Sequence, residues 1–233
     1  MRQFRIGILG CGVISNTYIA DIQRFYKDLK IAACADVLPE AARAHAEKYG
    51  IEKACTPEEL LADDSLDIIV NLTPPPFHPA LNRKIIEAGR NLFCEKPFAP
   101  TLKEAKEVLD LADEKSVMVV CAPDTFLSSG LQSMRFYLDA GIIGEPFFVT
   151  ANMTDFGVET WHPNPLPYYT EYAGPMLDMA PYYLSALISL PAPLRASPPS
   201  AQCPERSAIF IPDRKRGRIS NRPFRLIILR FSA

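Results

Sequence analysis

The sequence predicts a doubly wound α/β fold, with helices on both faces of a parallel sheet, followed by an incomplete α+β domain. Apolar runs and amphipathic stretches alternate regularly through the first 122 residues. The runs Leu66–Leu72 and Val117–Cys121 are almost uninterrupted, as expected for parallel strands that are covered on both faces. A turn with Gly10 and Gly12 follows the first run and opens a helical stretch, which is typical of a Rossmann-type βα unit.

The elements of this first domain follow from local patterns. Strands are expected where apolar runs occur: Phe4–Leu9, Ile31–Ala35, Lys53–Cys55, Leu66–Leu72, Asn91–Cys94 and Val117–Cys121. Helices are expected where helical spacing lies between them: Ser15–Phe25, Pro39–Tyr49, Pro57–Ala62, Pro79–Ala88 and Leu102–Lys115. Capping boxes and C-terminal glycines mark helix ends, at Thr56 with Glu59, Thr101 with Glu104, Gly50 and Gly89.

The alternation stops after Pro123, so we expect a nucleotide-binding domain over residues 1–122 and a partial substrate or oligomerisation domain over residues 123–233. The second domain is expected to contain a helix over Ser128–Ala140, a strand over Pro146–Asp155, a Pro- and Tyr-rich loop, and a helix over Gly174–Leu190. The chain is therefore expected to bury one full core and part of another.

Residues 191–233 differ in composition from the rest. They carry nine Lys and Arg against two Asp and Glu, a balance of +7, with seven prolines, whereas residues 1–190 have a balance of -9. The apolar run Leu226–Leu229 is expected to have no strand partner within this segment, so we expect most of it to pack poorly and to leave the Pro146–Asp155 strand uncovered. A frameshifted or truncated reading frame and a natural short variant with a basic tail both remain open.

Overall composition excludes several classes of partner. The net charge of -2 gives no reason to expect nucleic acid, and no apolar run approaches the ~20 residues that span a membrane. We expect the N-terminus to enter its first strand directly, without a cleavable hydrophobic leader. The six cysteines form no C-x-x-C pair, so we expect buried, reduced thiols, a cytoplasmic protein and no metal site.

The glycine-rich turn indicates dinucleotide binding. Gly10 permits the tight turn, and Gly12 lets the main chain approach a pyrophosphate. Val13 and Ile14 begin the helix, whose free N–H groups and dipole favour phosphate. Ser15 takes the third small position, where helix and strand pack closely. The alternative is a glycine turn without a ligand.

Asp36 ends the second expected strand and narrows the choice of cofactor. Its carboxylate can accept hydrogen bonds from the adenosine ribose hydroxyls and would repel a 2′-phosphate. Val37 and Leu38 supply no cation for that phosphate, so NAD is favoured over NADP. The alternative is that Asp36 only caps the helix that begins at Pro39.

Three polar clusters follow expected strands or share a helix face. Thr73-Pro74-Pro75-Pro76-Phe77-His78 is a rigid loop after Leu66–Leu72, and Glu95-Lys96-Pro97 follows Asn91–Cys94. Asp178 and Tyr182 have the i, i+4 spacing of one helix face. Ligands of open α/β sheets bind at the carboxyl ends of the strands, so these clusters are candidate site residues.

Together the fingerprint, the T-P-P-x-x-H loop and the E-K-P tripeptide resemble the Gfo/Idh/MocA family of NAD(P)-dependent oxidoreductases, over roughly residues 3–190. The resemblance implies hydride transfer between nicotinamide and a sugar, polyol or related carbonyl compound. It places Thr73, Pro74 and His78 at the cofactor, Glu95 near the nicotinamide ribose, and Lys96 beside nicotinamide and substrate. A homo-oligomer like those of the family is doubtful for so short a chain.

The resemblance also assigns Asp178 to the family's catalytic D-x-x-x-H motif, although Tyr182 replaces the histidine here. The proton donor is therefore Lys96 or Tyr182, with both open. Plain structural roles also remain open for these residues and for His78, as a loop-stabilising histidine. The alternative function is a catalytically inactive nucleotide-binding remnant or a regulator that senses the cofactor.

Overall fold

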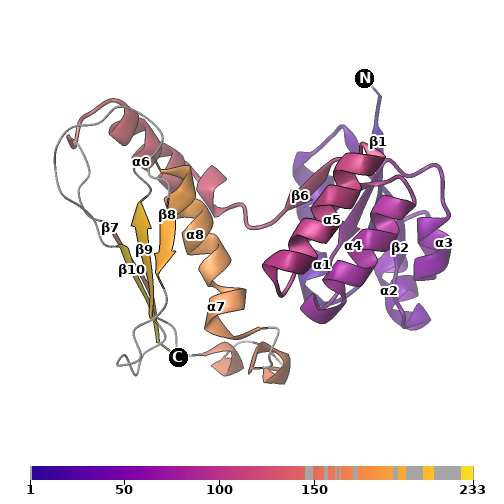
Figure 1. Cartoon of the computed structure of the whole chain (residues 1–233). Helices are drawn as coiled ribbons and strands as arrows, with labels where there is room; N and C mark the ends of the chain where they lie inside the picture. The colour runs from indigo at the N-terminus through magenta and orange to yellow at the C-terminus, as the bar shows by residue number, and fades with distance from the viewer. Residues whose placement is uncertain are drawn as a thin grey trace. The chain divides into compact units, whose positions relative to one another are not determined.

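The structure, a computed structural model, describes residues 2–144, 149–154, 157–160, 162, 164–169, 173–190, 194–197, 207–212 and 227–232. The chain divides into two compact units, Met1–Ala122 and Pro123–Ala233 (Figure 1). Within the described residues, every helix is too short or too polar to cross a lipid bilayer.

The first unit contains a parallel sheet of six strands in the order β3-β2-β1-β4-β5-β6. The strands are β1 (Phe4–Leu9), β2 (Leu29–Ala35), β3 (Lys53–Cys55), β4 (Ile68–Asn71), β5 (Asn91–Cys94) and β6 (Val119–Cys121). The expected doubly wound fold is confirmed. The ends of β4 and β6 differ from the apolar runs, because strand ends depend on neighbouring strands as well as on hydrophobicity.

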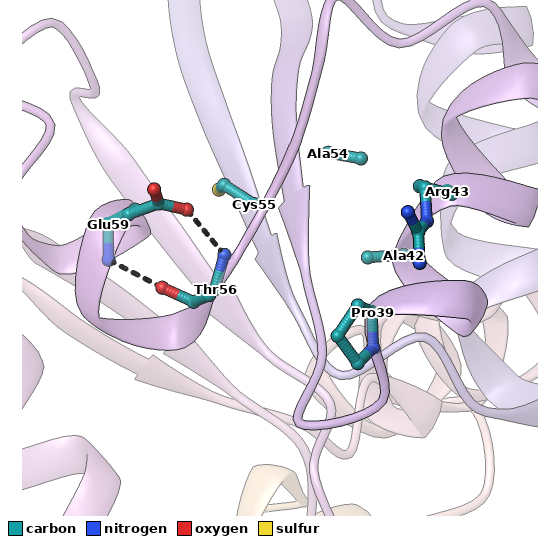
Figure 2. A pocket seen from close by; sticks show the side chains of 7 residues that line it. All are labelled: Pro39, Ala42, Arg43, Ala54, Cys55, Thr56 and Glu59. Carbon is teal, nitrogen blue, oxygen red and sulfur yellow. Dashed lines mark hydrogen bonds between the residues drawn. The ribbon is translucent and has the colours of Figure 1, made fainter.

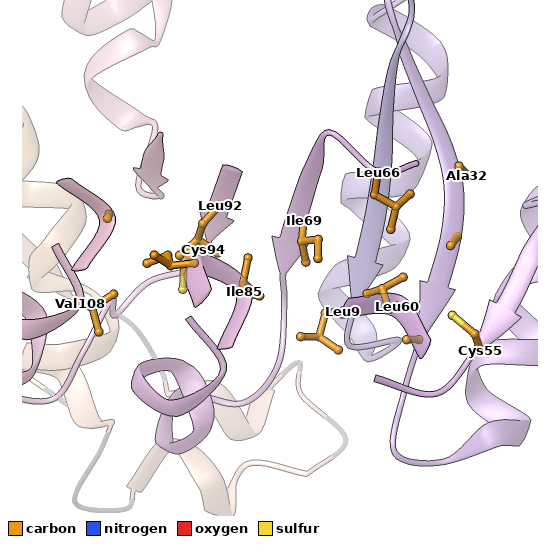
Figure 3. Packing of buried hydrophobic residues seen from close by; sticks show 14 residues of the cluster. Leu9, Ala32, Cys55, Leu60, Leu66, Ile69, Ile85, Leu92, Cys94 and Val108 are labelled. Carbon is orange, nitrogen blue, oxygen red and sulfur yellow. The ribbon is translucent and has the colours of Figure 1, made fainter. Parts of the chain in front are cut away.

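Five helices cover the two faces of this sheet. They are α1 (Val13–Phe25), α2 (Pro39–Tyr49), α3 (Pro57–Leu61), α4 (His78–Glu87) and α5 (Leu102–Lys115). One hydrophobic cluster contains Leu60 of α3, Ile85 of α4 and Val108 of α5, packed on strand residues such as Ile69 (Figure 3). A second cluster contains Ile19 of α1 and Ala42 of α2. The sheet is therefore buried on both faces, which explains its nearly continuous apolar strands.

Local signals set several helix ends as expected. At α3, Thr56 accepts from the Glu59 amide and the Glu59 carboxylate accepts from the Thr56 amide, so the capping box is complete. At α5, the Thr101 side chain accepts a hydrogen bond from the Glu104 amide. The Glu104 carboxylate, however, accepts from the Thr101 hydroxyl and not from the Thr101 amide. The second expected box is therefore only half formed.

The second unit combines helices with a four-stranded sheet. Its described elements are η2 (Thr125–Leu127), α6 (Ser129–Asp139), β7 (Val149–Thr154), η3 (Val158–Thr160), η4 (Leu166–Tyr169), α7 (Gly174–Asp178), α8 (Ala180–Ser189), β8 (Leu194–Ser197), β9 (Ser207–Pro212) and β10 (Ile227–Ser232). Residues 146–148 and 155 of the expected Pro146–Asp155 strand lie outside the described residues. Ala180 and Leu187 of α8 pack with Ala151 of β7.

The expectation of an unpartnered strand after residue 190 was wrong. β10 pairs in parallel with β7 along its whole length and antiparallel with β9, so both of its edges are satisfied. β9 also pairs with β8, giving the order β7-β10-β9-β8. β7 therefore has a strand partner along one edge. The pattern of one short apolar run cannot reveal partners that lie far away in the chain.

Candidate functional site

The turn after β1 lies where the strand order reverses, the point at which open α/β sheets bind ligands. Gly10 has a φ of +101° there. A Cβ on Gly10 would lie 2.8 Å from the carbonyl carbon of Leu72 and 2.9 Å from the amide nitrogen of Thr73. Main-chain atoms cannot yield as the end of a side chain can, so this close approach of two loops requires glycine.

The start of α1 is open to a ligand. Gly12 is the N-cap residue, no side chain caps the helix, and its first turn has no acidic residue. A Cβ on Gly12 would meet no atom within 4 Å, and Val13 and Ile14 are 63% and 43% exposed. The first amides of α1 therefore lack a side-chain acceptor, and the space beside Gly12 fits an approaching phosphate.

Asp36 is held in a fixed orientation directly after β2. The Cys11 amide donates to its Oδ2 at 2.8 Å, and the Leu38 amide donates to its Oδ1 at 2.9 Å. Each carboxylate oxygen has a second acceptor direction, so both remain able to receive a hydroxyl. The half-buried carboxylate is thus oriented by the glycine turn on one side and by the start of α2 on the other.

A cavity of about 170 Å³ lies between the starts of α2 and α3 (Figure 2). Its residues are Pro39, Ala42, Arg43, Ala54, Cys55, Thr56 and Glu59. Cys55 is the register partner of Ala35, so the cavity adjoins the end of β2 that carries Asp36. Arg43 is the cation on its wall, and sequence reasoning missed it. Helical spacing from Pro39 could have revealed it, because residues four apart share a helix face.

A second contact that the sequence did not predict holds the glycine turn against α2. Ser15 is fully buried, and its hydroxyl donates to the Gly12 carbonyl at 2.6 Å. The Ser15 oxygen also lies 2.9 Å from Nε2 of His45 on α2. The serine at the third small position therefore joins the turn to α2, a contact that glycine could not make.

Behind the loop that follows β4 lies a buried amide network. Asn71 accepts from the Thr73 hydroxyl at 2.6 Å and donates to Oδ1 of Asn82 at 2.8 Å. Asn82 in turn donates to the Cys94 sulfur at 3.2 Å. Both asparagines are fully buried, so this network fixes the loop to α4 and β5.

His78 is fully buried and connects two site loops. Its Nε2 lies 2.6 Å from the Thr73 carbonyl oxygen, and its Nδ1 lies 2.7 Å from the Pro97 carbonyl oxygen. Both ring nitrogens thus face main-chain carbonyls, and a nitrogen that carries a proton donates to its carbonyl. This geometry supports the loop-stabilising alternative, while the direct cofactor contact stays a prediction.

Glu95 and Lys96 follow β5 at the same edge of the sheet. The Lys96 amide donates to Oε2 of Glu95 at 2.8 Å, and the Tyr18 hydroxyl donates to Oε1 at 2.7 Å. Lys96 precedes Pro97 through a cis peptide bond. The structure thus brings the ends of β1, β2, β4 and β5 together at one edge, with Gly10, Asp36, Thr73 and Glu95 on them.

Asp178 and Tyr182 lie in the second unit and not on one continuous helix. Asp178 is the last residue of α7, and Tyr182 is in the first turn of α8, with Met179 between the two helices. Pro181 has no amide hydrogen to continue the helical bonding, which explains the interruption. The prediction that Asp178 and Tyr182 share the face of one helix is therefore wrong, because they lie at the adjoining ends of two helices.

Cys55 and Cys121 of the first unit are poor nucleophiles. Burial raises the pKa of the Cys55 thiol to about 11 and that of Cys121 to about 12, so both stay protonated at neutral pH. Among the described residues, no group of three His, Cys, Asp or Glu side chains is placed to hold a metal ion.

Comparison with known proteins places residues 4–122 in an oxidoreductase family with an NAD-binding Rossmann fold. The chain is 28% identical over 152 residues to inositol 2-dehydrogenase/D-chiro-inositol 3-dehydrogenase of Lacticaseibacillus casei, covering 64% of this chain and 44% of that protein. It is 26% identical over 176 residues to myo-inositol 2-dehydrogenase of Thermotoga maritima, covering 75% and 51%. The chain thus spans about half the length of these relatives.

A solved structure shares the fold. The WlbA dehydrogenase of Chromobacterium violaceum, crystallised with NADH and UDP-GlcNAcA, superposes with a TM-score of 0.81 at 20% identity. The match covers 99% of this chain and 67% of that one, so it includes the strands after residue 190. At this identity the likeness shows the fold alone.

Proposed function

The chain belongs to the Gfo/Idh/MocA oxidoreductase family, and from this membership we propose that it binds NAD(H) and transfers hydride between nicotinamide and a sugar, polyol or related carbonyl compound. The main observation behind the proposal is that the Gly10 turn, the Asp36 carboxylate and Glu95-Lys96 lie at the same edge of the sheet. The names of the inositol dehydrogenases and the UDP-GlcNAcA bound to WlbA support the substrate class.

Residues of the first unit fit the proposed cofactor along its length. The amides at Gly12, Val13 and Ile14 would bind the pyrophosphate, and the oriented Asp36 carboxylate would accept the adenosine ribose hydroxyls. Thr73 and Pro74 would border the cofactor on the β4 side. Glu95 would accept the hydroxyls of the nicotinamide ribose, since each of its oxygens keeps an acceptor direction.

The chemistry divides between cofactor and protein. When bound, NAD supplies the hydride acceptor. The chain must hold the alcohol carbon close by and take the proton of its hydroxyl group. We assign Lys96 Nζ as the acceptor of that proton. Asp178 and Tyr182 are further catalytic candidates from the second unit. His78 acts by positioning the Pro97 loop.

The alternative, an inactive remnant or a regulator, gains no support from the relatives, which are named as dehydrogenases.

The test is turnover by the whole chain. The protein is incubated with NAD and a panel of cyclic polyols, aldoses and nucleotide sugars, while the absorbance of NADH is followed. Lys96→Ala should lower kcat by ~10²-fold or more, the range of an acid–base group, and should leave NAD affinity nearly unchanged.

Lys103→Ala is the matched control, because Lys103 is an exposed lysine of α5. Full kcat in Lys96→Ala would show that Lys96 is misassigned. Tight NAD binding with no turnover on any member of the panel would contradict the substrate class.

A further inference from the structure

We propose that Tyr18 is a positioning residue that orients Glu95, and through it the Lys96 main chain, at the nicotinamide end of the site. This inference rests on the proposed function. Tyr18 is on α1, 77 positions before Glu95 in the sequence, and its hydroxyl donates to Glu95 Oε1 at 2.7 Å. A hydrogen bond to a carboxylate is among the stronger kinds.

Two separate contacts fix Tyr18 to β5. Its ring meets Phe93 edge to face, with 5.8 Å between ring centroids and an interplanar angle of 65°. Its hydroxyl reaches Glu95, two residues farther along the same segment. The ring contact determines where the hydroxyl lies, so α1 and the end of β5 hold the carboxylate between them.

The carboxylate transmits this orientation to Lys96. Its other oxygen, Oε2, accepts from the Lys96 amide at 2.8 Å. On the far side of Lys96, the Pro97 carbonyl lies against His78. Without the Tyr18 hydroxyl, Glu95 can rotate, and the Lys96 amide loses a fixed acceptor while the His78 contact remains. Tyr18 thus acts through Glu95 and needs no contact with substrate.

Tyr18→Phe removes the hydroxyl and keeps the ring on Phe93. Tyr49→Phe is the matched control, because the Tyr49 hydroxyl also donates at 2.7 Å, to Asn16. In the cofactor-free chain labelled with nitrogen-15, Tyr18→Phe should speed hydrogen exchange of the Lys96 amide by about tenfold, the effect of one bond to a charged group. Tyr49→Phe should leave that amide unchanged.

A double-mutant cycle separates positioning from general loosening of the fold. In a Glu95→Ala background, Tyr18→Phe should produce no further change at the Lys96 amide, because the acceptor through which it acts is gone. Equal exchange in Tyr18→Phe and the unmodified chain, or an undiminished effect in the Glu95→Ala background, would overturn the proposal.

Turnover provides a second measurement. Tyr18→Phe should lower kcat by about tenfold with NAD affinity changed less than about threefold. An unchanged kcat alongside faster Lys96 exchange would overturn the catalytic part of the proposal. If the unmodified chain turns over no substrate, the proposed function fails, whereas the exchange cycle still decides whether Tyr18 positions Glu95.

Discussion

At the residue scale, Asp36 is the group that should discriminate between cofactors. Its carboxylate is fixed by the Cys11 and Leu38 amides, and Val37 beside it is 82% exposed and apolar. We predict that the chain binds NAD(H) more tightly than NADP(H). Asp36→Ala should weaken NAD binding by about tenfold or more, the effect of losing hydrogen bonds to a charged group, as measured by calorimetry.

Arg43 gives this prediction a second part. It lines the cavity beside the end of β2, and its side chain makes no hydrogen bond or ion pair within the described part of the chain. In the Asp36→Ala variant, NADP(H) should gain relative to NAD(H), and Arg43→Ala in that background should reduce the gain. Arg43→Ala alone should leave NAD affinity unchanged. Equal or tighter NADP binding by the unmodified chain would contradict the role of Asp36.

At the scale of elements, the connection between α3 and β4 should make stability depend on pH. Hydrogen bonds from Ser65 and from Lys53 on β3 lower the pKa of Asp63 to about 2. A carboxyl group whose pKa is lower in the folded state stabilises the fold above its unfolded pKa of about 4, and the contribution disappears as the pH falls toward the folded pKa.

Asp63→Asn should therefore lower the melting temperature of the first unit at neutral pH by about 4 °C, the shift for a loss of roughly 1 kcal/mol. The difference from the unmodified chain should shrink below pH ~4 and be mostly lost near pH ~2. Asp21→Asn, on the exposed face of α1, is the control. A constant difference from neutral pH to pH ~2 would show that the Asp63 charge is not responsible.

At the scale of the whole molecule, the first unit should bind NAD by itself. Both of its hydrophobic clusters lie within Met1–Ala122, as do Asp36, Glu95 and Lys96. We predict that a fragment of residues 1–122 folds and binds NAD with a Kd within about threefold of the whole chain, less than 1 kcal/mol apart. Circular dichroism and calorimetry measure this. A folded fragment that fails to bind would show that the second unit supplies part of the cofactor site.

Several features of the fold and site could be predicted from the sequence because they depend on neighbouring residues. The six strands and five helices of the first unit follow from apolar runs and helical spacing. The complete Thr56 capping box and Gly50 in the left-handed conformation at the end of α2 depend on a few adjacent residues. The Gly10 turn and Asp36 could likewise be predicted, because each comes directly after the end of an expected strand.

Only the tertiary structure decided which distant segments meet. It pairs Tyr18 with Glu95, joins Asn71 to Asn82, directs both His78 nitrogens to main-chain carbonyls, and supplies β10 with two partners. A local pattern determines which conformation a segment favours and which of its faces is apolar. The partner of a hydroxyl, an amide or a strand edge depends instead on the packing of segments that are far apart in the chain, and no single segment contains that information.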